Sequence, residues 1–410
     1  MGVSNNGPLN GVRIVDLSIA LAGPYASMLL GQLGAEVIKV ETPGGGDVLR
    51  KVSGPSLNGE NFYFLAVNAN KKSVELDLFT KSGREAFYDL IKVSDVVLDN
   101  HRVGVLERLG ANYETLKKIN PRIICSSIYG YGSSGPYIDW PPCYDIIAQA
   151  LTGIISLTGE PGRPPAKPPM DLLDMATGMF AASGIQGALY AREKSGVGMQ
   201  IEVNMLDSGL SLMSVLFSFY FCGGGVPQPL GSGSISLAPW GAYPTRDGYI
   251  AFGVCWPRIA RVLDVEWIVT DSRFSTPESR YANRAKLDEI LSEALRKENT
   301  EDWMELMRVE DIPAGPVLKL DEVPKHLQIA HNEAIRTLQH PVAGDIKIIA
   351  CPIKIPGTYE AVYIPPPTLG EHTQSVLHEL LGYSDQKISE IRAEAEANAE
   401  ELRKHLYKLL

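Results

Sequence analysis

Cysteine is scarce in this chain of 410 residues, and the few cysteines are widely scattered. They stand at positions 125, 143, 222, 255 and 351, and no two of them form a C-x-x-C pair. An odd and dispersed set of this kind indicates neither a disulfide framework nor a zinc site. We therefore expect a protein of the reducing cytoplasm that contains no structural metal.

Long apolar runs are also lacking. The longest, Met205 to Phe221, is interrupted by Asp207 and by several serines, so it predicts a buried helix and not a membrane span. The opening residues, MGVSNNGPLNG, contain neither a positively charged segment nor an apolar one. We expect no secretion signal and no membrane partner.

Histidine and net positive charge are in short supply as well. None of the seven histidines belongs to an H-E-x-x-H motif, which leaves a zinc hydrolase unsupported. The formal net charge is −10, which argues against a nucleic-acid partner. A ligand that carries phosphates would need a local basic pocket.

The sequence does contain a regular alternation of predicted strands and helices. Residues 11–17, GVRIVDL, predict a strand, a helix follows from Pro24, and EVIKVE at 36–41 predicts the next strand. The order recurs with strands at 73–78, 95–100 and 122–128 and helices at 82–93 and 113–119. This alternation is typical of an α/β fold with a doubly wound, Rossmann-like parallel sheet.

The second half of the chain changes in character. A helix rich in small residues spans 174–193, and helices are expected near 256–263, 280–297 and 300–308. Glycine- and proline-rich stretches suggest linkers. We predict a large domain over 1–222, a linker over 223–240, a smaller α+β domain over 241–320, a second linker over 321–355, and a return to the large domain over 356–410. We expect the charged helix after 373 to be solvated.

A glycine motif stands directly after the strand at 122–128. Gly130, Gly132 and Gly135 match G-x-G-x-x-G, the fingerprint of a dinucleotide-binding loop. That fingerprint requires the last glycine to open a helix, whereas here Pro136 follows at once and Trp140-Pro141-Pro142 comes soon after. A nucleophile elbow, G-x-S-x-G around Ser134, fails because Pro136 stands where its closing glycine belongs. We therefore expect neither a nicotinamide oxidoreductase nor an elbow hydrolase.

Asp174 stands at the start of the glycine- and alanine-rich helix. Its position favours a first-turn or N-cap carboxylate that interacts with the positive end of the helix dipole. The same field keeps the carboxylate ionised, and an ionised carboxylate is able to attack an acyl carbon. The residue type and place alone leave the structural and the chemical role open.

Longer motifs, in a fixed order along nearly the whole chain, resemble those of one enzyme family. They include GVRIVDLSIALAGPYASMLLGQLGAEVIKVE, NANKKSVELDL, YETLKKINPRIICSSIYGYGSSGPY, DMATGMFAASGIQGALYAREKSGVGMQIEVNMLD and LGEHT. The chain resembles the class III CoA-transferases of the CaiB/BaiF superfamily, which include formyl-CoA:oxalate and carnitine CoA-transferases. The resemblance implies transfer of CoA from an acyl-CoA to a carboxylic acid, with CoA as a substrate and with no tightly bound cofactor or metal.

The resemblance also implies a covalent mechanism. Family members use the aspartate of a D-x-x-x-G helix, which Asp174 and Gly178 match. It would form a mixed anhydride with the acyl group and then an aspartyl-CoA thioester. The family architecture further implies an interlocked homodimer, in which the two linkers let each chain thread the other.

Further site residues follow from the same resemblance. CoA-binding positions are implied at Ala22, Gly23, Asn100, His101, Arg102, Arg108 and Tyr131, and substrate-pocket positions at Tyr144, Gly231 and Gly233. Two positions depart from relatives, because Thr42 replaces an arginine and Phe79 a lysine found in some of them. We expect Lys71 and Lys72 to be solvated and not to bind the ligand.

Several alternatives stay open. An α-methylacyl-CoA racemase of the same superfamily uses a His-Asp pair, where this chain has Tyr144-Asp145; tyrosine is a poor base at neutral pH, so transfer is favoured. A subunit of a heteromeric transferase and a non-catalytic α/β ligand-binding protein are the other candidates. Large side chains around the implied pocket favour an acyl group larger than formyl or oxalyl; they are Trp140, Tyr144, Met175, Met205 and Trp240.

Overall fold

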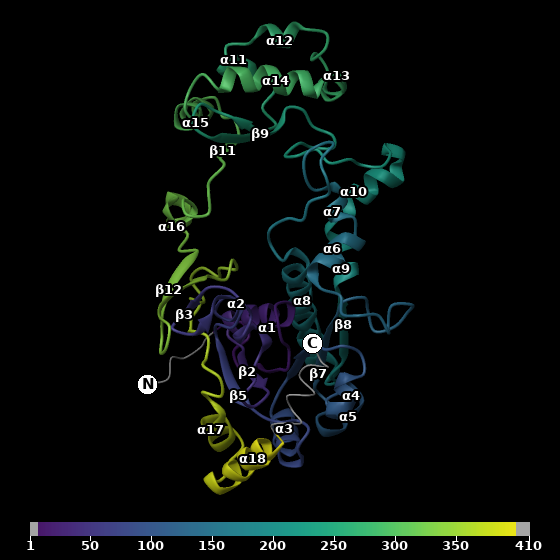
Figure 1. The fold of residues 1–410 in the computed structure, drawn as a ribbon, viewed down its shortest axis with the longest axis vertical. Helices are drawn as coiled ribbons and strands as arrows, with labels where there is room; N and C mark the ends of the chain where they lie inside the picture. The colour runs from purple at the N-terminus through teal and green to yellow at the C-terminus, as the bar shows by residue number, and fades with distance from the viewer. Residues whose placement is uncertain (1–6, 399–410) are drawn as a thin grey trace. The chain divides into compact units, whose positions relative to one another are not determined.

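The computed structural model describes residues 7–398, which divide into two compact units (Figure 1). The first unit comprises 1–152, 169–214 and 330–410, of which the ends lie outside the described residues. The second comprises 153–168 and 215–329. Each unit has a hydrophobic core of its own, so each is described by itself.

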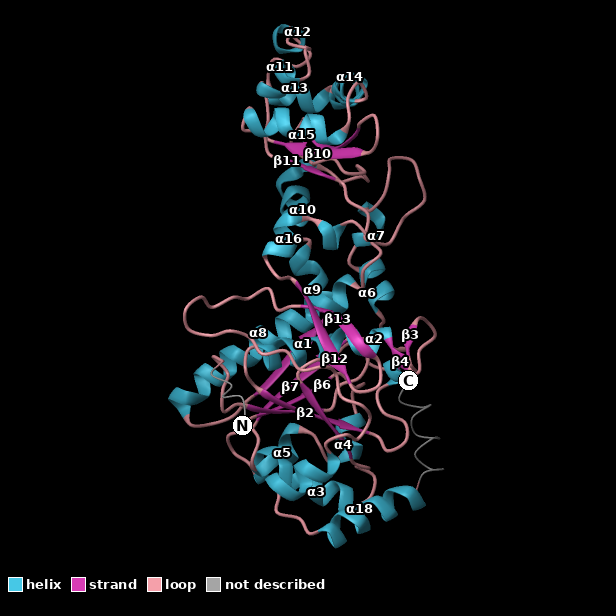
Figure 2. Cartoon of the chain, turned by 90° about the vertical axis from the view of Figure 1, so that its left-hand side faces the viewer, coloured by secondary structure: helices cyan, strands magenta, loops and turns pink. Residues whose placement is uncertain are grey.

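A six-stranded parallel sheet forms the centre of the first unit (Figure 2). Its strands, in spatial order, are β5 (Lys71–Glu75), β2 (Glu36–Glu41), β1 (Arg13–Asp16), β6 (Val96–Asp99), β7 (Ile124–Tyr129) and β8 (Gln200–Asn204). The central strands are buried on both faces, which explains their nearly continuous apolar sequence. The predicted doubly wound α/β fold is confirmed.

Helices cover both faces of this sheet. Neighbouring residues of a strand point to opposite faces, so they pack against different helices. Ile14 of β1 packs in a cluster with α1 (Ala22–Gln32) and α8 (Leu172–Ser195). The next residue, Val15, packs in a second cluster on the other face. That face is covered by α3 (Lys81–Lys92), α5 (Tyr113–Ile119) and α18 (Asp385–Ala397).

Shorter elements complete the first unit. They are the helices α2 (Phe62–Val67), α4 (Val105–Leu109), α6 (Asp145–Leu151), α9 (Met205–Leu212) and α17 (Thr373–Ser375), and the hairpins β3 (Ser56–Leu57) with β4 (Glu60–Asn61) and β12 (Ile335–His340) with β13 (Gly344–Ile349).

The second unit is a smaller α+β structure. Its antiparallel sheet has the order β11 (Ala314–Pro316), β10 (Tyr249–Gly253) and β9 (Trp240–Pro244). Five helices pack near it: α11 (Arg258–Val262), α12 (Trp267–Thr270), α13 (Pro277–Ala282), α14 (Arg284–Leu295) and α15 (Thr300–Val309). Ile250, Phe274 and Leu291 lie in its core with no exposed surface.

Two sequence predictions are corrected here. Residues 205–221 do not form one buried helix, because α9 ends at Leu212 and a separate helix, α10 (Ser214–Phe219), follows. No residue of α10 is buried within this chain, although the helix is apolar in composition. The helix α18 is not simply solvated either, because Ile388, Ile391 and Ala395 line up on one buried face.

Within residues 7–398 no single helix is both long and apolar enough to cross a membrane, while α9 with the bent segment Ser214–Gly224 meets the length and composition criteria as a pair.

Candidate active site

A cavity of about 210 Å³ opens at the carboxyl ends of β1, β6 and β7 in the first unit. From β1 the chain builds β2 and β5 on one side, and then crosses to build β6, β7 and β8 on the other. The boundary between β1 and β6 is therefore the topological switch point of the sheet. Open α/β sheets bind their ligands at this point, outside the carboxyl ends of the strands.

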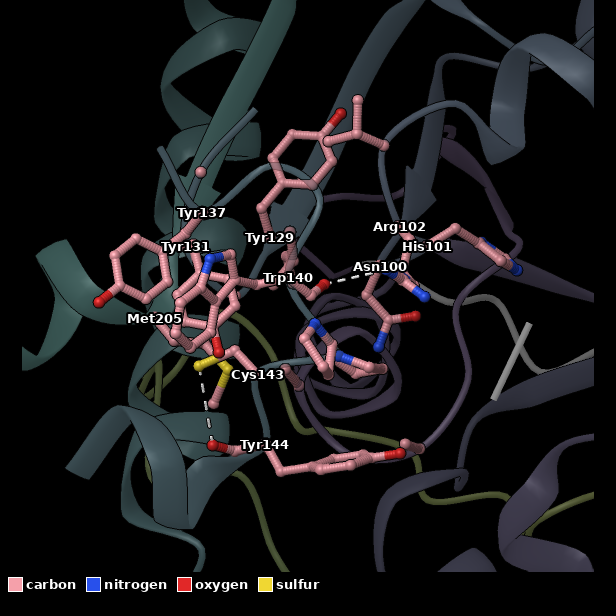
Figure 3. Close-up of a pocket in the computed structure, with 18 of the residues that line it drawn as sticks. Asn100, His101, Arg102, Tyr129, Tyr131, Tyr137, Trp140, Cys143, Tyr144 and Met205 are labelled. Atoms are coloured by element: carbon pink, nitrogen blue, oxygen red, sulfur yellow. Dashed lines mark hydrogen bonds between the residues drawn. The ribbon is translucent and has the colours of Figure 1, made fainter. Parts of the chain in front are cut away.

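Most of the implied site residues meet at this cavity (Figure 3). Those that line it are Ala22, Asn100, His101, Arg102, Tyr131, Tyr144 and Asp174. They come from separate stretches of sequence, which the parallel strands bring to one edge of the sheet. The fold thus gives these residues a common location.

Four of the implied residues do not line the cavity. Gly23 packs against Ser18, whose Cβ would lie 2.2 Å from a Cβ at position 23. Arg108 is exposed in the last turn of α4. Gly231 and Gly233 belong to the second unit, where the Gly231 N–H donates to the Gly159 carbonyl at 2.9 Å. Gly233 borders a separate cavity of about 40 Å³.

Asp174 lies in the first turn of α8, after the N-cap residue Asp171. One helical turn further on, Gly178 faces the start of α1, where an added Cβ would lie 2.6 Å from the Ala22 carbonyl oxygen. Residues four apart share a helix face, so the close contact at Gly178 directs Asp174 toward the loop before α1. This geometry gives the D-x-x-x-G spacing a physical reason.

Aromatic side chains form one wall of the cavity. The ring centroids of Tyr131 and Tyr137 are 5.1 Å apart, and those of Tyr137 and Trp140 are 4.5 Å apart. Arg102 Nη2 donates to the Trp140 carbonyl at 2.9 Å and links this wall to the end of β6 (Figure 3). The wall is therefore built from aromatic rings, and the Arg102 guanidinium anchors its edge through this hydrogen bond.

The large side chains expected around the pocket separate into two groups. Trp140, Tyr144 and Met205 line the cavity. Met175 packs beside a different cluster, and Trp240 belongs to the second unit. Three further lining residues, Tyr129, Tyr137 and Cys143, were not singled out from the sequence, although they stand within or beside the glycine motif.

Cys143 is the one cysteine among the residues that line this cavity. Burial raises the pKa of its thiol to about 11, and the carboxylates of Asp174 and Asp145 contribute to the rise. A thiol in this state is neutral at physiological pH and a poor nucleophile.

The glycine loop that carries the aromatic wall does not begin a helix. Residues 130–144 are irregular, and the next helix, α6, starts only at Asp145. Gly132 and Gly135 have φ angles of +117° and +100°, which side-chain-bearing residues rarely adopt. A Cβ at Gly130 would lie 2.3 Å from the Cβ of Cys143. The glycines serve an irregular loop, and the prolines correctly predicted that no helix follows them.

Lys71 is buried, which corrects the expectation that it is solvated. Its Nζ donates to Asp16 Oδ2 at 3.1 Å, to the Pro24 carbonyl at 2.8 Å and to Asn68 Oδ1 at 2.8 Å. Burial lowers its pKa to about 8. Lys72, on the opposite face of the strand, stays half-exposed and pairs with Glu36 at 2.7 Å. Successive side chains of β5 point to opposite faces of the sheet, which separates the two lysines. The sequence alone does not show which of them faces the core.

A buried acid and a histidine stand at the end of β6. Burial raises the pKa of Asp99 to about 7, although the Ser127 hydroxyl and the His101 N–H both donate to its carboxylate. Burial lowers the pKa of His101 to about 4. At neutral pH the imidazole is uncharged, so among the cavity's side chains the positive charge is supplied by Arg102.

The donor set of the site offers no metal centre. Among residues 7–398 no three His, Cys, Asp or Glu side chains are arranged to hold a metal ion.

Comparison with known proteins gives the family. The model of CoA-transferase family III matches residues 9–373. Human succinyl-CoA:glutarate CoA-transferase is 36% identical over 393 residues, which cover 95% of this chain and 90% of the human protein. The acetyl-CoA:oxalate CoA-transferase of Acetobacter aceti is 34% identical, with 86% of this chain and 90% of that protein covered.

A solved structure agrees with these sequence matches. The crystal structure of a CaiB/BaiF family protein from Brucella suis superimposes with a TM-score of 0.81 at 32% identity, and the match covers 92% of this chain and all of that one. The chain therefore belongs to CoA-transferase family III, the CaiB/BaiF family, and is an acyl-CoA:carboxylate CoA-transferase. The resemblance stated from the sequence motifs is confirmed.

Proposed function

We propose that Asp174 is the covalent nucleophile of CoA transfer. Its carboxylate attacks the carbonyl carbon of the donor acyl-CoA, a C–O bond forms, and CoA leaves as a thiolate. The thiolate then attacks the Asp174 carbonyl carbon of the mixed anhydride and releases the donor acid as a carboxylate. This leaves an aspartyl-CoA thioester on the enzyme.

The second half of the cycle runs in reverse with a new acid. The carboxylate of the acceptor attacks the aspartyl-CoA thioester and again expels the CoA thiolate. The thiolate attacks the acceptor carbonyl of this second anhydride, which yields the new acyl-CoA and regenerates the Asp174 carboxylate. Atoms and charges balance without any water or added cofactor.

The position of Asp174 is the observation that supports this proposal. It is the carboxylate of the first turn of α8 that lines the cavity at the switch point, beside a neutral thiol. Expulsion of a thiolate by a carboxylate is uphill by about 6 kcal/mol, because the two conjugate acids differ by about four pK units. Binding of the distant nucleotide end of CoA can offset that difference.

The start of α1 and the end of β6 are the places proposed for the phosphates of CoA. The N-cap residue Leu21 contributes no side-chain cap, and the first N–H groups of a helix have no partner within it. Ala22 places this helix end on the cavity, and Arg102 adds a cation. Together these groups provide an anion-binding site of the kind found at helix N-termini.

We propose short dicarboxylic acids as the substrates. The relatives named above act on succinyl-CoA with glutarate and on acetyl-CoA with oxalate, according to their names. A cavity of about 210 Å³ with an aromatic wall accommodates an acyl chain of a few carbons. Succinyl-CoA with glutarate is therefore the first donor and acceptor pair to test.

A trapping experiment tests the covalent mechanism. The purified chain, without any added subunit, is incubated with succinyl-CoA and treated with hydroxylamine or borohydride, and its peptides are mapped by mass spectrometry. We expect modification at Asp174 that depends on the donor. A label on another residue, or none during turnover, rules out this mechanism. Turnover by the purified chain alone would also exclude the need for a second subunit.

We further propose a homodimer, in which a second copy covers apolar side chains that this chain leaves exposed. They lie on α6, α8 and α9, and include Ile146, Leu151, Met179, Phe180 and Leu210. Exposed apolar side chains gathered on three neighbouring helices are typical of a surface that a partner covers. Sedimentation of the wild type and of Phe180→Glu tests this, and a wild-type monomer at micromolar concentration would contradict it.

A further inference from the structure

The side chain of Asn100 is attached to the main chain on the opposite side of the switch point. Its Oδ1 accepts a hydrogen bond of 2.9 Å from the Ile19 N–H, and its Nδ2 donates one of 2.6 Å to the Ile19 carbonyl. The amide of Asn100 thus pairs with both polar groups of one residue, as a neighbouring strand would. It ties the loop after β1 to the end of β6.

A buried ion pair holds the two residues on either side of Ile19. Lys39 Nζ donates to the Ser18 carbonyl at 2.7 Å, and Asp47 Oδ1 accepts from the Ala20 N–H at 3.1 Å. Lys39 and Asp47 are themselves 2.9 Å apart, and neither side chain has more than 1% of its surface exposed. Three side chains from separate parts of the chain therefore hold three consecutive residues.

The main chain that they hold is strained. Ala20 has a φ angle of +61°, in the left-handed region that costs a residue with a Cβ about 1–2 kcal/mol. Such a conformation persists only where the surroundings enforce it, and it is common at ligand sites. Ile19, Ala20 and Ala22 all line the cavity, and α1 begins at Ala22.

We propose that Asn100, with the Lys39–Asp47 ion pair behind it, acts as a positioning device that presents the N-terminus of α1 to the pyrophosphate of CoA. This rests on the proposed function, because it assumes that the cavity binds CoA. Asn100 then acts on CoA through Ile19 and not through its own amide. The loop is held in its binding conformation before the ligand arrives, which lowers the entropic cost of binding.

The charges around Lys39 indicate a role for this ion pair beyond packing. Lys39 lies near three carboxylates, those of Asp47, Asp16 and Glu41, and their effect exceeds that of burial and raises its pKa. These carboxylates therefore favour the charged form of the ammonium. A buried ion pair is often no more stabilising than an apolar pair of similar volume. Its hydrogen bonds to the Ser18–Ala20 main chain therefore offer a reason why an ion pair, and not an apolar pair, stands here.

The decisive experiment compares two donors in Asn100→Ala. One is succinyl-CoA, and the other is succinyl-pantetheine, which carries the same thioester but no pyrophosphate or nucleotide. Loss of two hydrogen bonds to the loop should weaken binding of CoA and raise the KM for succinyl-CoA by about 10- to 100-fold. The kcat/KM for succinyl-pantetheine should fall far less than that for succinyl-CoA, and equal losses for the two donors would contradict a role directed at the pyrophosphate.

Asn120→Ala is the matched control. Asn120 Nδ2 donates to the carbonyls of Ile91 and Ser94 at 3.0 and 2.9 Å, so the same side chain is removed from main-chain partners away from the cavity. It should lose thermal stability without any change in the dissociation constant of CoA. If both variants lose stability and neither loses affinity for CoA, Asn100 is only structural and the inference is wrong.

Two further measurements separate this inference from the proposed function, and the second needs no variant. Direct titration of the wild type with CoA tests the proposed function, because absence of binding would show that the cavity is not a CoA site. If the wild type binds CoA and Asn100→Ala binds it equally well, only the positioning role is wrong. Hydrogen exchange of the ligand-free wild type should show protected N–H groups at Ile19 and Ala20. Exchange there as fast as in an unstructured loop would overturn the inference even if no variant can be purified.

Discussion

Asp145 Oδ1 accepts a hydrogen bond of 2.8 Å from the N–H of Leu173, in the first turn of α8 and one residue before Asp174. Its other oxygen accepts from Gln149 Nε2 at 2.6 Å, and Asp145 is buried. This carboxylate therefore fixes the helix end that carries Asp174. A carboxylate engaged on both oxygens in this way is poorly suited to exchange protons with an α-carbon, which favours transfer over racemisation.

Replacement of Asp174 by asparagine should abolish transfer and spare binding. The variant keeps the size of the side chain and loses the attacking oxygen, so we expect kcat to fall at least about 10⁴-fold. Titration with CoA should give the wild-type dissociation constant. Asp171→Asn, three residues earlier on the same helix end, is the control and should remain active. Residual turnover of Asp174→Asn near the wild-type rate would mean that another group is the nucleophile.

The reactivity of Cys143 should report the charge of Asp174. With a pKa raised to about 11, the thiol should be alkylated slowly by iodoacetamide at pH 8, and faster by about tenfold per pH unit until the pH approaches 11. Asp174→Asn removes a nearby negative charge that disfavours the thiolate, so the apparent pKa should fall. Mass spectrometry of the Cys143 peptide gives both profiles, with exposed Cys222 as an internal reference. Identical profiles in the two proteins would place Asp174 too far from the thiol to act on it.

Asp99→Asn should change how stability depends on pH. Because the pKa of Asp99 rises from 3.8 to about 7 on folding, the folded protein binds this proton over a range in which the unfolded chain has lost it. Stability from this group is therefore full below pH 3.8 and is lost as the pH rises through about 7. The variant has no carboxyl at this position and does not lose stability in this way. Its free energy of unfolding, relative to that of the wild type, should therefore increase by a few kcal/mol between pH 4 and pH 8, on the order of 1.4 kcal/mol per pK unit.

Urea unfolding across that pH range provides the measurement. The nearby His101, with its pKa lowered to about 4, contributes a pH dependence of the opposite sign in both proteins. Because His101 Nδ1 lies only 3.9 Å from Asp99 Oδ1, the comparison is repeated in a His101→Asn background, where the remaining difference reports Asp99. A difference that stays constant from pH 4 to pH 8 would show that Asp99 is ionised in the fold throughout.

Two of the three glycines of α8, Gly178 and Gly187, should respond in opposite ways to alanine. At Gly178 the new Cβ meets the Ala22 carbonyl at 2.6 Å, so the two helices must separate, and we expect a loss of about 1–3 kcal/mol together with reduced transfer. At Gly187 nothing lies within 4 Å, and the higher helix propensity of alanine should stabilise the protein by about 0.5–1 kcal/mol. Chemical unfolding measures both. Equal effects at the two positions would contradict the proposed close packing of α8 on α1.

The order of elements and the family could both be predicted from the sequence. Strands buried on both faces need continuous apolar runs, and helices between them need a 3.6-residue period, so the α/β alternation can be recognised in the order of the residues. The prolines after Gly135 excluded a dinucleotide loop by local sterics alone. Asp174 was singled out because Asp174 and Gly178 match the D-x-x-x-G pattern of the family that the sequence resembles, and its catalytic role stays a prediction.

The tertiary structure decided which polar groups are buried and what they contact. Lys71 and Lys72 are adjacent and chemically identical in the sequence, and only the packing of β5 sends one into the core and the other toward solvent. Asn100 meets Ile19 across 81 positions, a pairing that depends on strand order and not on any local signal. Local sterics and periodicity act within a few residues, whereas desolvation and charge pairing depend on neighbours that only the completed fold brings together.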